Sequence, residues 1–208
     1  MLVVGLIGPM GAGKSVIAQE LASCGGEVIR ADEISRDALA PGTDELAEVV
    51  RVFGRECLSD DGGLDRRALG SVVFADAQAR ERLESIVHPA MVRRMRERLA
   101  ELKHRRPPVR LVVIEAANLV QMDGLNLVDL TVMVTAPRDE RLRRVMARDG
   151  LSSIEVERRL VAQEEQGIEA FEADRVMVTD GGLAATRKQA QQLYEELVEG
   201  IRGPRVEA

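Results

Sequence analysis

The sequence predicts an α/β fold in which a parallel sheet of about five strands carries helices on its faces. Five short runs rich in apolar and β-branched residues predict the strands, at residues 2–7, 27–31, 110–114, 130–135 and 175–179. The run at 2–7 is continuously apolar, as in a strand covered on both faces. Because helical patterns separate these runs, we expect parallel strands joined by right-handed crossovers.

Helical patterns occupy much of the remaining chain. They lie at residues 16–22, 44–53, 89–104, 138–148, 154–166 and 183–201. In the third of these segments, Met91, Met95 and Leu99 follow the spacing of one face of an amphipathic helix. Pro89 suits the first turn of that helix, because no backbone donor is lost there.

Residues 33–109 separate the second and third predicted strands by far more chain than a crossover needs. Turn residues at 41–43 and 60–63 divide this insertion into short helices. We interpret it as a helical lobe able to sit over the carboxyl ends of the strands. The whole is expected to be one domain over residues 1–203, followed by a frayed tail at 204–208.

Composition excludes several classes of protein. The 208-residue chain has 29 basic and 35 acidic residues, which argues against a protein that coats nucleic acid. Cys24 and Cys57 lack the spacing of a metal site or a disulfide framework. The apolar run at 2–7 is too short to span a membrane or form a signal peptide, so we expect a cytoplasmic protein without membrane partners.

Residues 8–15 read Gly-Pro-Met-Gly-Ala-Gly-Lys-Ser and fit the P-loop pattern G-x-x-x-x-G-K-[ST]. They lie directly between a predicted strand and a predicted helix, which is the context that the motif requires. In such a loop, backbone N–H groups converge on phosphate oxygens, and the helix N-terminus adds partial positive charge. The motif therefore predicts a P-loop nucleotide-binding fold, similar to nucleoside and nucleotide kinases, that uses ATP.

The residues of this loop have separate expected roles. Those expected to hold the nucleotide are Gly8, Gly11, Ala12, Gly13, Lys14, Ser15 and Val16. Lys14 would span the β- and γ-phosphates and act in catalysis. The Ser15 hydroxyl would bind the Mg²⁺ that bridges the phosphates, a hard cation that keeps most of its ligands as water.

Two acidic residues follow predicted strands at the edge where the P-loop begins. Asp32 could accept the proton of an attacking hydroxyl, or it could cap the helix that follows it. Beside a P-loop we favour the catalytic role. Glu115 stands where an acid often holds water on the metal, but it could equally cap the next segment or pair with an arginine.

Arginines gather after the fourth predicted strand and indicate a lid over residues 138–166. They are Arg138, Arg141, Arg143, Arg144, Arg148, Arg158 and Arg159. A lid arginine neutralises charge that grows on the transferring phosphate, and we expect this of Arg144, with Arg148 on the nucleotide. The others are expected to be solvated surface charges. His88 has no partner acid at a recognisable spacing, so we expect it to order the start of the long helix or to contact the acceptor.

Four further segments resemble the dephospho-CoA kinase family. They are Val-Ile-Arg-Ala-Asp at 28–32, Gly-Leu-Asp-Arg-Arg-Ala-Leu at 63–69 with Val73 and Phe74, Ile-Val-His-Pro at 86–89 and Arg-Val-Met-Ala-Arg at 144–148. With the P-loop, the resemblance covers residues 1 to about 180. It implies that ATP phosphorylates the ribose 3′-hydroxyl of dephospho-CoA, giving CoA and ADP, and that the insertion at 33–109 binds the acceptor.

The resemblance also implies roles for single residues. Asp32 matches the expected catalytic base, residues 11–16 match the ATP loop, and Arg144 matches the lid arginine. Gln163 matches a family glutamine. The residues expected to bind the acceptor are Asp32, Arg66, His88, Glu115 and Gln163.

The chain departs from the family pattern at three places. Residues 116–120 read Ala-Ala-Asn-Leu-Val where the family usually has Pro-Leu-Leu-Phe-Glu, Arg30 replaces an acid or apolar residue, and Asp180 replaces an asparagine. These departures leave two alternatives. The chain could be a kinase for another small nucleotide or metabolite, or a nucleotide-binding module without turnover that signals through its lid. We expect a monomer or weak homo-oligomer that acts on a small molecule.

Overall fold

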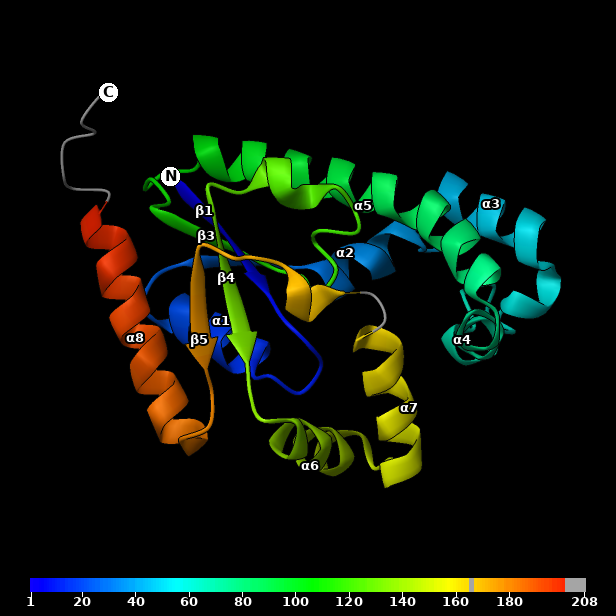
Figure 1. The fold of residues 1–208 in the computed structure, drawn as a ribbon. Coiled ribbons are helices and arrows are strands. Elements are labelled where there is room, and N and C mark those ends of the chain that lie inside the picture. Colours follow the sequence, from blue (N-terminus) through cyan, green and yellow to red (C-terminus); the bar gives the residue numbers. More distant parts are fainter. Residues whose placement is uncertain (165–166, 201–208) are drawn as a thin grey trace. The chain divides into compact units, whose positions relative to one another are not determined.

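A five-stranded sheet forms the centre of the fold in the computed structural model, which describes residues 1–164 and 167–200 (Figure 1). Its strands are β1 (Leu2–Ile7), β2 (Glu27–Arg30), β3 (Leu111–Glu115), β4 (Leu130–Thr135) and β5 (Arg175–Val178). The strand order is β2-β3-β1-β4-β5. β1 pairs in parallel with β3 and β4, and β4 with β5. The predicted α/β sheet is confirmed, with strand ends within one residue of those expected.

Eight helices and three short 3₁₀ turns are found in the described part of the chain. The helices are α1 (Lys14–Ser23), α2 (Ala31–Ala38), α3 (Asp44–Phe53), α4 (Arg66–Ala75), α5 (Ala77–His104), α6 (Arg138–Asp149), α7 (Ser153–Glu164) and α8 (Gly182–Gly200), and the turns are η1 (Arg55–Cys57), η2 (Gly124–Leu127) and η3 (Ile168–Ala170). The predicted helix at 44–53 is confirmed to the residue. The ends of the predicted helices at 165–166 and 201, and the predicted tail at 204–208, lie outside the described residues.

The start of the long helix α5 corrects one prediction. The helix begins at Ala77, so Pro89 lies in its interior and not in its first turn. The start signal is Asp76, whose side chain accepts a hydrogen bond from the Gln78 N–H (2.8 Å). Proline costs the helix one backbone donor, but Val87 and Met91 on either side are buried, and packing of this face maintains the helix.

One face of the sheet is closed by α1 and α8, which pack together (Figure 1). Side chains alternate along a strand, so every second residue of β1 faces these helices. The buried cluster on this face comprises Val4, Leu6, Ala12, Ile17, Ala18, Leu21, Leu111, Val113, Val132, Val134, Ala190, Leu193, Leu197 and Val198. On the opposite face, a Cβ at Gly5 would lie 2.7 Å from Leu119, so the segment after β3 packs directly on β1.

Residue contacts divide the chain into two compact units, one formed by residues 1–29 with the chain from 101 onward, and one formed by 30–100. In the second unit, the Thr43 hydroxyl accepts a hydrogen bond from the Leu46 N–H (3.2 Å) and caps α3, and the Asp65 carboxylate caps α4. The predicted turn at 60–63 closes a small antiparallel bridge between Leu58 and Leu64. Among the described residues, no helix is long and apolar enough to cross a bilayer.

A partly buried carboxylate joins α3 to α5 within the second unit. Glu45 accepts hydrogen bonds from Arg93 (2.6 Å) and Arg94 (3.3 Å), and 14% of its side chain is exposed. Burial opposes ionisation of this carboxyl, but the hydrogen bonds from the two arginines outweigh burial and lower the pKa of Glu45 to about 2. A carboxyl whose pKa is depressed by folding stabilises the folded state above its unfolded pKa, and that stability is lost as the pH falls towards 2.

We therefore predict that Glu45→Gln lowers the free energy of unfolding by about 2 kcal/mol at pH 7, and that the deficit shrinks as the pH falls from 4.5 towards 2, because the carboxyl of the unfolded wild-type chain is protonated first and that of the folded chain only near pH 2. Urea unfolding followed by circular dichroism at several pH values measures both. Glu48→Gln is the matched control, since Glu48 pairs with the exposed Arg51 on the same helix and its loss should leave the free energy of unfolding close to that of the wild type. If the loss of unfolding free energy in Glu45→Gln did not change with pH, ionisation of Glu45 would not be the source of this stability.

Candidate active site

The loop between β1 and α1 adopts a backbone that depends on glycine. Gly8, Gly11 and Gly13 have φ angles of 137°, 78° and 98°, which residues with a side chain rarely adopt. A Cβ at Gly8 would lie 2.1 Å from the Val134 carbonyl oxygen of β4, and a Cβ at Gly11 would lie 2.7 Å from the Arg141 carbonyl oxygen of α6. The loop is therefore held closely between β4 and α6.

The N–H groups of this loop are only partly used by the protein. The Met10 N–H donates to Oε1 of Gln163 (2.6 Å), and the Ala12 N–H donates weakly to the Pro9 carbonyl (3.3 Å). Within residues 1–164 and 167–200, the N–H groups of Gly11, Gly13 and Ser15 have no hydrogen-bond acceptor. Unused amides at the start of a helix form a site for an anion with several oxygens, such as a polyphosphate.

Lys14 and Val16 complete the turn into α1. The Lys14 ammonium donates to the carbonyl oxygens of Gly8 (2.7 Å) and Pro9 (3.0 Å), so its positive charge lies against the loop. The Val16 N–H donates to the Gly13 carbonyl (3.1 Å) and starts the helical pattern. The loop thus combines a cation with a helix N-terminus.

Ser15 and Glu115 bring two oxygen ligands together at the carboxyl ends of β1 and β3. The Ser15 hydroxyl donates to Oε1 of Glu115 over 2.6 Å. Among the described residues, no group of three or more His, Cys, Asp or Glu side chains could hold a metal by itself. A hydroxyl and a single carboxylate suit Mg²⁺, which takes its other ligands from water and from nucleotide phosphates.

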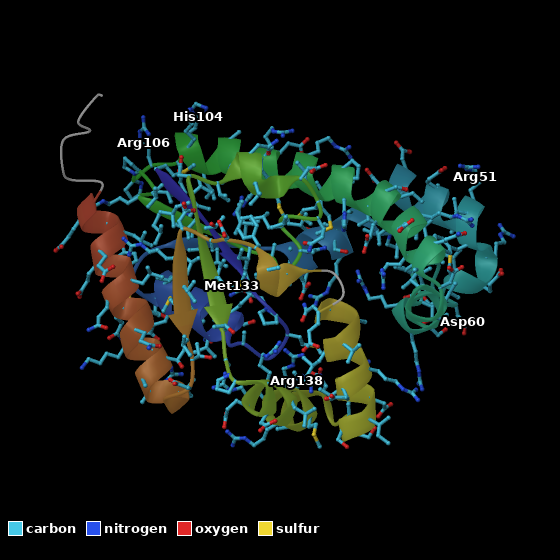
Figure 2. All side chains as sticks on the ribbon, viewed as in Figure 1. Arg51, Asp60, His104, Arg106, Met133 and Arg138 are labelled. Atoms are coloured by element: carbon cyan, nitrogen blue, oxygen red, sulfur yellow. The ribbon has the colours of Figure 1, made fainter. Side chains whose placement is uncertain are left out.

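The helices α6 and α7 pack against each other beside the loop. Val145, Val156 and Leu160 form their buried contact, and Met10 of the loop packs on it. Figure 2 labels Arg138 on α6, from where its guanidinium pairs with Glu157 (2.6 Å) and Glu164 (3.2 Å) of α7. The ion pairs hold the two helices together, and the packing of Met10 joins the phosphate loop to them.

Arg144 and Arg148, the two arginines singled out in the lid, have different surroundings. Arg144 donates to the carbonyl oxygens of Gly11 (3.3 Å) and Thr179 (2.6 Å) and to the Thr179 hydroxyl (2.8 Å). Arg148 is largely exposed and forms two hydrogen bonds to the neighbouring Asp149, whose pKa it lowers. Arg144 thus contacts the phosphate loop, whereas Arg148 is engaged with its chain neighbour.

Three further predicted residues, Asp32, Arg66 and His88, belong to the unit formed by residues 30–100. Arg30 occupies the N-cap position of α2, so the alternative that Asp32 caps this helix was wrong, and Asp32 lies exposed in the first turn. His88 lies inside α5, so it does not order the start of the helix. The capping prediction failed because the helix begins directly at the end of β2, without an intervening loop.

Arg66, the first residue of α4, lies close to two charged groups of α2. Its desolvation and the nearby guanidinium of Arg36 lower the pKa of Arg66, while the Asp32 carboxylate opposes this. Asp32 and Arg36 are four residues apart and therefore project from the same face of α2. A carboxylate and two guanidiniums gather on this part of the unit.

Sequence reasoning missed Thr179, which directly follows β5. It is 1% exposed, and its hydroxyl contacts both the phosphate loop and Arg144. The sequence shows only a threonine at a strand end, since the contacts depend on how three distant segments meet. Gln163 was predicted at the site, but its contact with the Met10 N–H could not be foreseen.

The features above define a P-loop kinase fold. They are a parallel sheet with a glycine loop after its central strand, a lysine and a serine at the start of the following helix, and an arginine-bearing helix pair beside the loop. The family model described as dephospho-CoA kinase matches residues 2–185. The chain belongs to the dephospho-CoA kinase family.

Individual relatives agree over nearly the full length of the chain. A dephospho-CoA kinase of Moorella thermoacetica is 42% identical over 95% of this chain and 92% of its own, and one of Anaeromyxobacter dehalogenans is 43% identical over 99% of this chain and 96% of its own. The crystal structure of TT1252 from Thermus thermophilus is similar with a TM-score of 0.74 at 34% identity, covering 94% of this chain and 97% of that one.

The contact between Gly8 and β4 leads to a prediction. Gly8→Ala should lower the free energy of unfolding by about 2 kcal/mol or more and abolish binding of ATP, because the added Cβ collides with a backbone carbonyl and displaces the loop. Gly150→Ala is the control, since Gly150 also has a positive φ but no atom within 4 Å, and only the strain of about 1 kcal/mol is expected. Thermal unfolding and titration with ATP would distinguish them. Equal effects of both substitutions would show that close contact at Gly8 is unimportant.

Proposed function

We propose that this chain transfers the γ-phosphate of ATP to the ribose 3′-hydroxyl of dephospho-CoA, giving CoA and ADP. The observation that supports this most strongly is the loop at Gly8–Ser15, with open amides and a lysine, in a chain of the dephospho-CoA kinase family. Membership of the family supports dephospho-CoA as the acceptor, and the loop provides a site for the phosphates of ATP, the donor. The fold alone would fit a kinase for many hydroxyl compounds.

On the donor side, the amides of Gly11, Gly13 and Ser15 bind the phosphate oxygens, and Lys14 neutralises the charge on the β- and γ-phosphates. The Ser15 hydroxyl and the Glu115 carboxylate would hold the Mg²⁺, directly or through water. Its positive charge would supply stabilisation of the negative charge on the leaving ADP. The glycines keep the loop close to β4 and α6, and the N–H groups of Gly11, Gly13 and Ser15 have no acceptor among the described residues.

On the acceptor side, Asp32 accepts the proton of the attacking hydroxyl. The hydroxyl oxygen forms a bond to the γ-phosphorus while the bond between this phosphorus and the leaving oxygen of ADP breaks. Asp32 follows the carboxyl end of β2, the kind of position where α/β proteins present catalytic groups, and its side chain is exposed and not used as a helix cap. These properties suit a general base.

Other predicted residues support these two sides. Arg66, next to Arg36, is suited to an anionic group of the acceptor, and His88 of α5 is proposed to contact the same molecule. Gln163 acts on the donor side through the Met10 N–H, and Arg144 neutralises the transferred phosphate, with Arg148 proposed to contact the nucleotide.

The segment that departs from the family pattern is partly core. Ala116 and Leu119 are buried, and Leu119 packs against Gly5 and Gly124 below the sheet. Part of the difference at 116–120 therefore serves packing. We also propose that the enzyme acts in the cytosol, where free thiols such as Cys24 and Cys57 stay reduced, as a monomer or weak homo-oligomer, which sedimentation would measure.

The direct test is incubation of the purified chain with ATP, Mg²⁺ and dephospho-CoA, with the products identified by mass. We expect CoA and ADP in equal amounts. A panel of other nucleotides and small alcohols serves as the control for acceptor identity. If ATP binds but dephospho-CoA is not phosphorylated while another acceptor is, the acceptor assignment is wrong.

We predict that Asp32→Asn reduces turnover by roughly 10² or more and leaves the affinity for ATP within about twofold, because the amide cannot accept the proton. Asp37→Asn makes the same charge change at an exposed position on the same helix and should be close to wild type. Steady-state kinetics and titration with ATP give both quantities. Wild-type turnover in Asp32→Asn would rule out its role as the base.

The metal site is tested separately with Ser15→Ala. Loss of this hydroxyl should raise the Mg²⁺ concentration needed for half-maximal activity by about tenfold, while saturating Mg²⁺ restores part of the rate. Ser23→Ala at the other end of α1 removes a hydroxyl that bonds only to its own helix and should change nothing. An unaltered Mg²⁺ requirement in Ser15→Ala would place the ion elsewhere.

A further inference from the structure

Thr179 connects three segments that meet at the phosphate loop. Its hydroxyl lies 2.6 Å from the carbonyl oxygen of Ala12 in the loop, and 2.8 Å from Nη1 of Arg144 on α6. Its own backbone N–H donates to the Thr135 carbonyl at the end of β4 (2.8 Å). The side chain is 1% exposed, so water does not replace these partners.

The chemistry of the hydroxyl allows only one arrangement of these bonds. A threonine hydroxyl has one hydrogen and two lone pairs. Arg144 is always a donor, so the hydroxyl accepts from it and gives its own hydrogen to a carbonyl. Ala12 takes that hydrogen, because the second candidate, the Thr135 carbonyl, is farther away at 3.4 Å.

The same threonine holds the arginine a second time through its backbone. Nη2 of Arg144 donates to the Thr179 carbonyl (2.6 Å), while Nη1 is shared between the Thr179 hydroxyl and the Gly11 carbonyl (3.3 Å). Two parallel hydrogen bonds from a planar guanidinium fix both its position and its orientation. The arginine and the loop are therefore connected through one buried side chain.

We propose that Thr179 is a positioning residue for phosphoryl transfer, whose hydroxyl holds the guanidinium of Arg144 and the carbonyl of Ala12 in the geometry that the phosphates require. The inference rests on the proposed function. Thr179 touches neither substrate in this role. It acts through Arg144 and through the loop, and a displacement of about 1 Å in either is enough to slow transfer.

The test compares a substitution that removes the hydroxyl of Thr179 with one that keeps it. Thr179→Val keeps the shape and removes the hydroxyl, whereas Thr179→Ser keeps the hydroxyl and removes the methyl group. We expect kcat to fall about 10-fold to 100-fold in the valine variant, with the KM for dephospho-CoA within about threefold, and kcat to stay within about threefold in the serine variant. Thr186→Val is the matched control, since Thr186 is also buried and, within the described part of the chain, its hydroxyl bonds only to the Gly182 carbonyl of its own helix.

A double-mutant cycle separates positioning from a general loss of structure. In the chemical step Thr179 acts through Arg144, and its contact with Ala12 serves nucleotide binding, so the valine substitution should reduce kcat at saturating ATP by less than about threefold in an Arg144→Ala background. Three outcomes would each overturn the proposal. They are full additivity of the kcat losses caused by Thr179→Val and Arg144→Ala, a wild-type kcat in Thr179→Val, and equal kcat losses in the valine and serine variants. If Thr179→Val does not fold, Thr179→Ala measured at low temperature takes its place in the cycle.

Binding of Mg²⁺·ADP keeps this test independent of the acceptor. Calorimetry should show affinity reduced about fivefold or more in Thr179→Val and within twofold in Thr179→Ser, because the loop carbonyl of Ala12 loses its partner. A wild-type chain that binds ADP but does not phosphorylate dephospho-CoA would refute the proposed function and leave this comparison valid. Unchanged affinity in the valine variant would overturn the positioning role.

Discussion

The close approach of the Gly8 backbone to β4 is the contact on which the site depends. With only 2.1 Å between a would-be Cβ and the Val134 carbonyl, no side chain fits, and the chain leaves β1 along one path. Gly11 repeats this constraint against α6. A loop confined from two sides has its amides placed before any nucleotide arrives, so little ordering entropy is lost on binding.

The protein uses the carbonyl groups of the loop and leaves several of its amides open. Lys14 occupies the carbonyls of Gly8 and Pro9, Arg144 occupies that of Gly11, and Thr179 that of Ala12. Each of these bonds directs a carbonyl oxygen, the negative end of a peptide dipole, towards the protein. The N–H groups are thereby left for an anion, and the electrostatic character of the site follows from the backbone and not from a high net charge.

Local patterns predicted the parts of this molecule that depend on near neighbours in the chain. Apolar runs predicted the strands because β1 and β3 are buried on both faces. The P-loop was predictable because its glycines, Lys14 and Ser15 all lie within residues 8–15. The predictions failed for Pro89 and for the capping alternative of Asp32. In both cases the start of the helix was set by residues outside the pattern that we used. Asp76 starts α5, and α2 begins directly after strand β2.

By itself, the sequence determined the class of sheet, the phosphate loop and the resemblance to a kinase family, because these depend on residue types at short, fixed spacings. Only the tertiary structure decided that Thr179 lies between Arg144 and Ala12, that Gln163 holds the Met10 N–H, and that Ser15 meets Glu115. These pairs are separated by 35 to 167 residues. Such contacts arise when strands align in register and helices pack on them, and no short segment of sequence encodes that geometry.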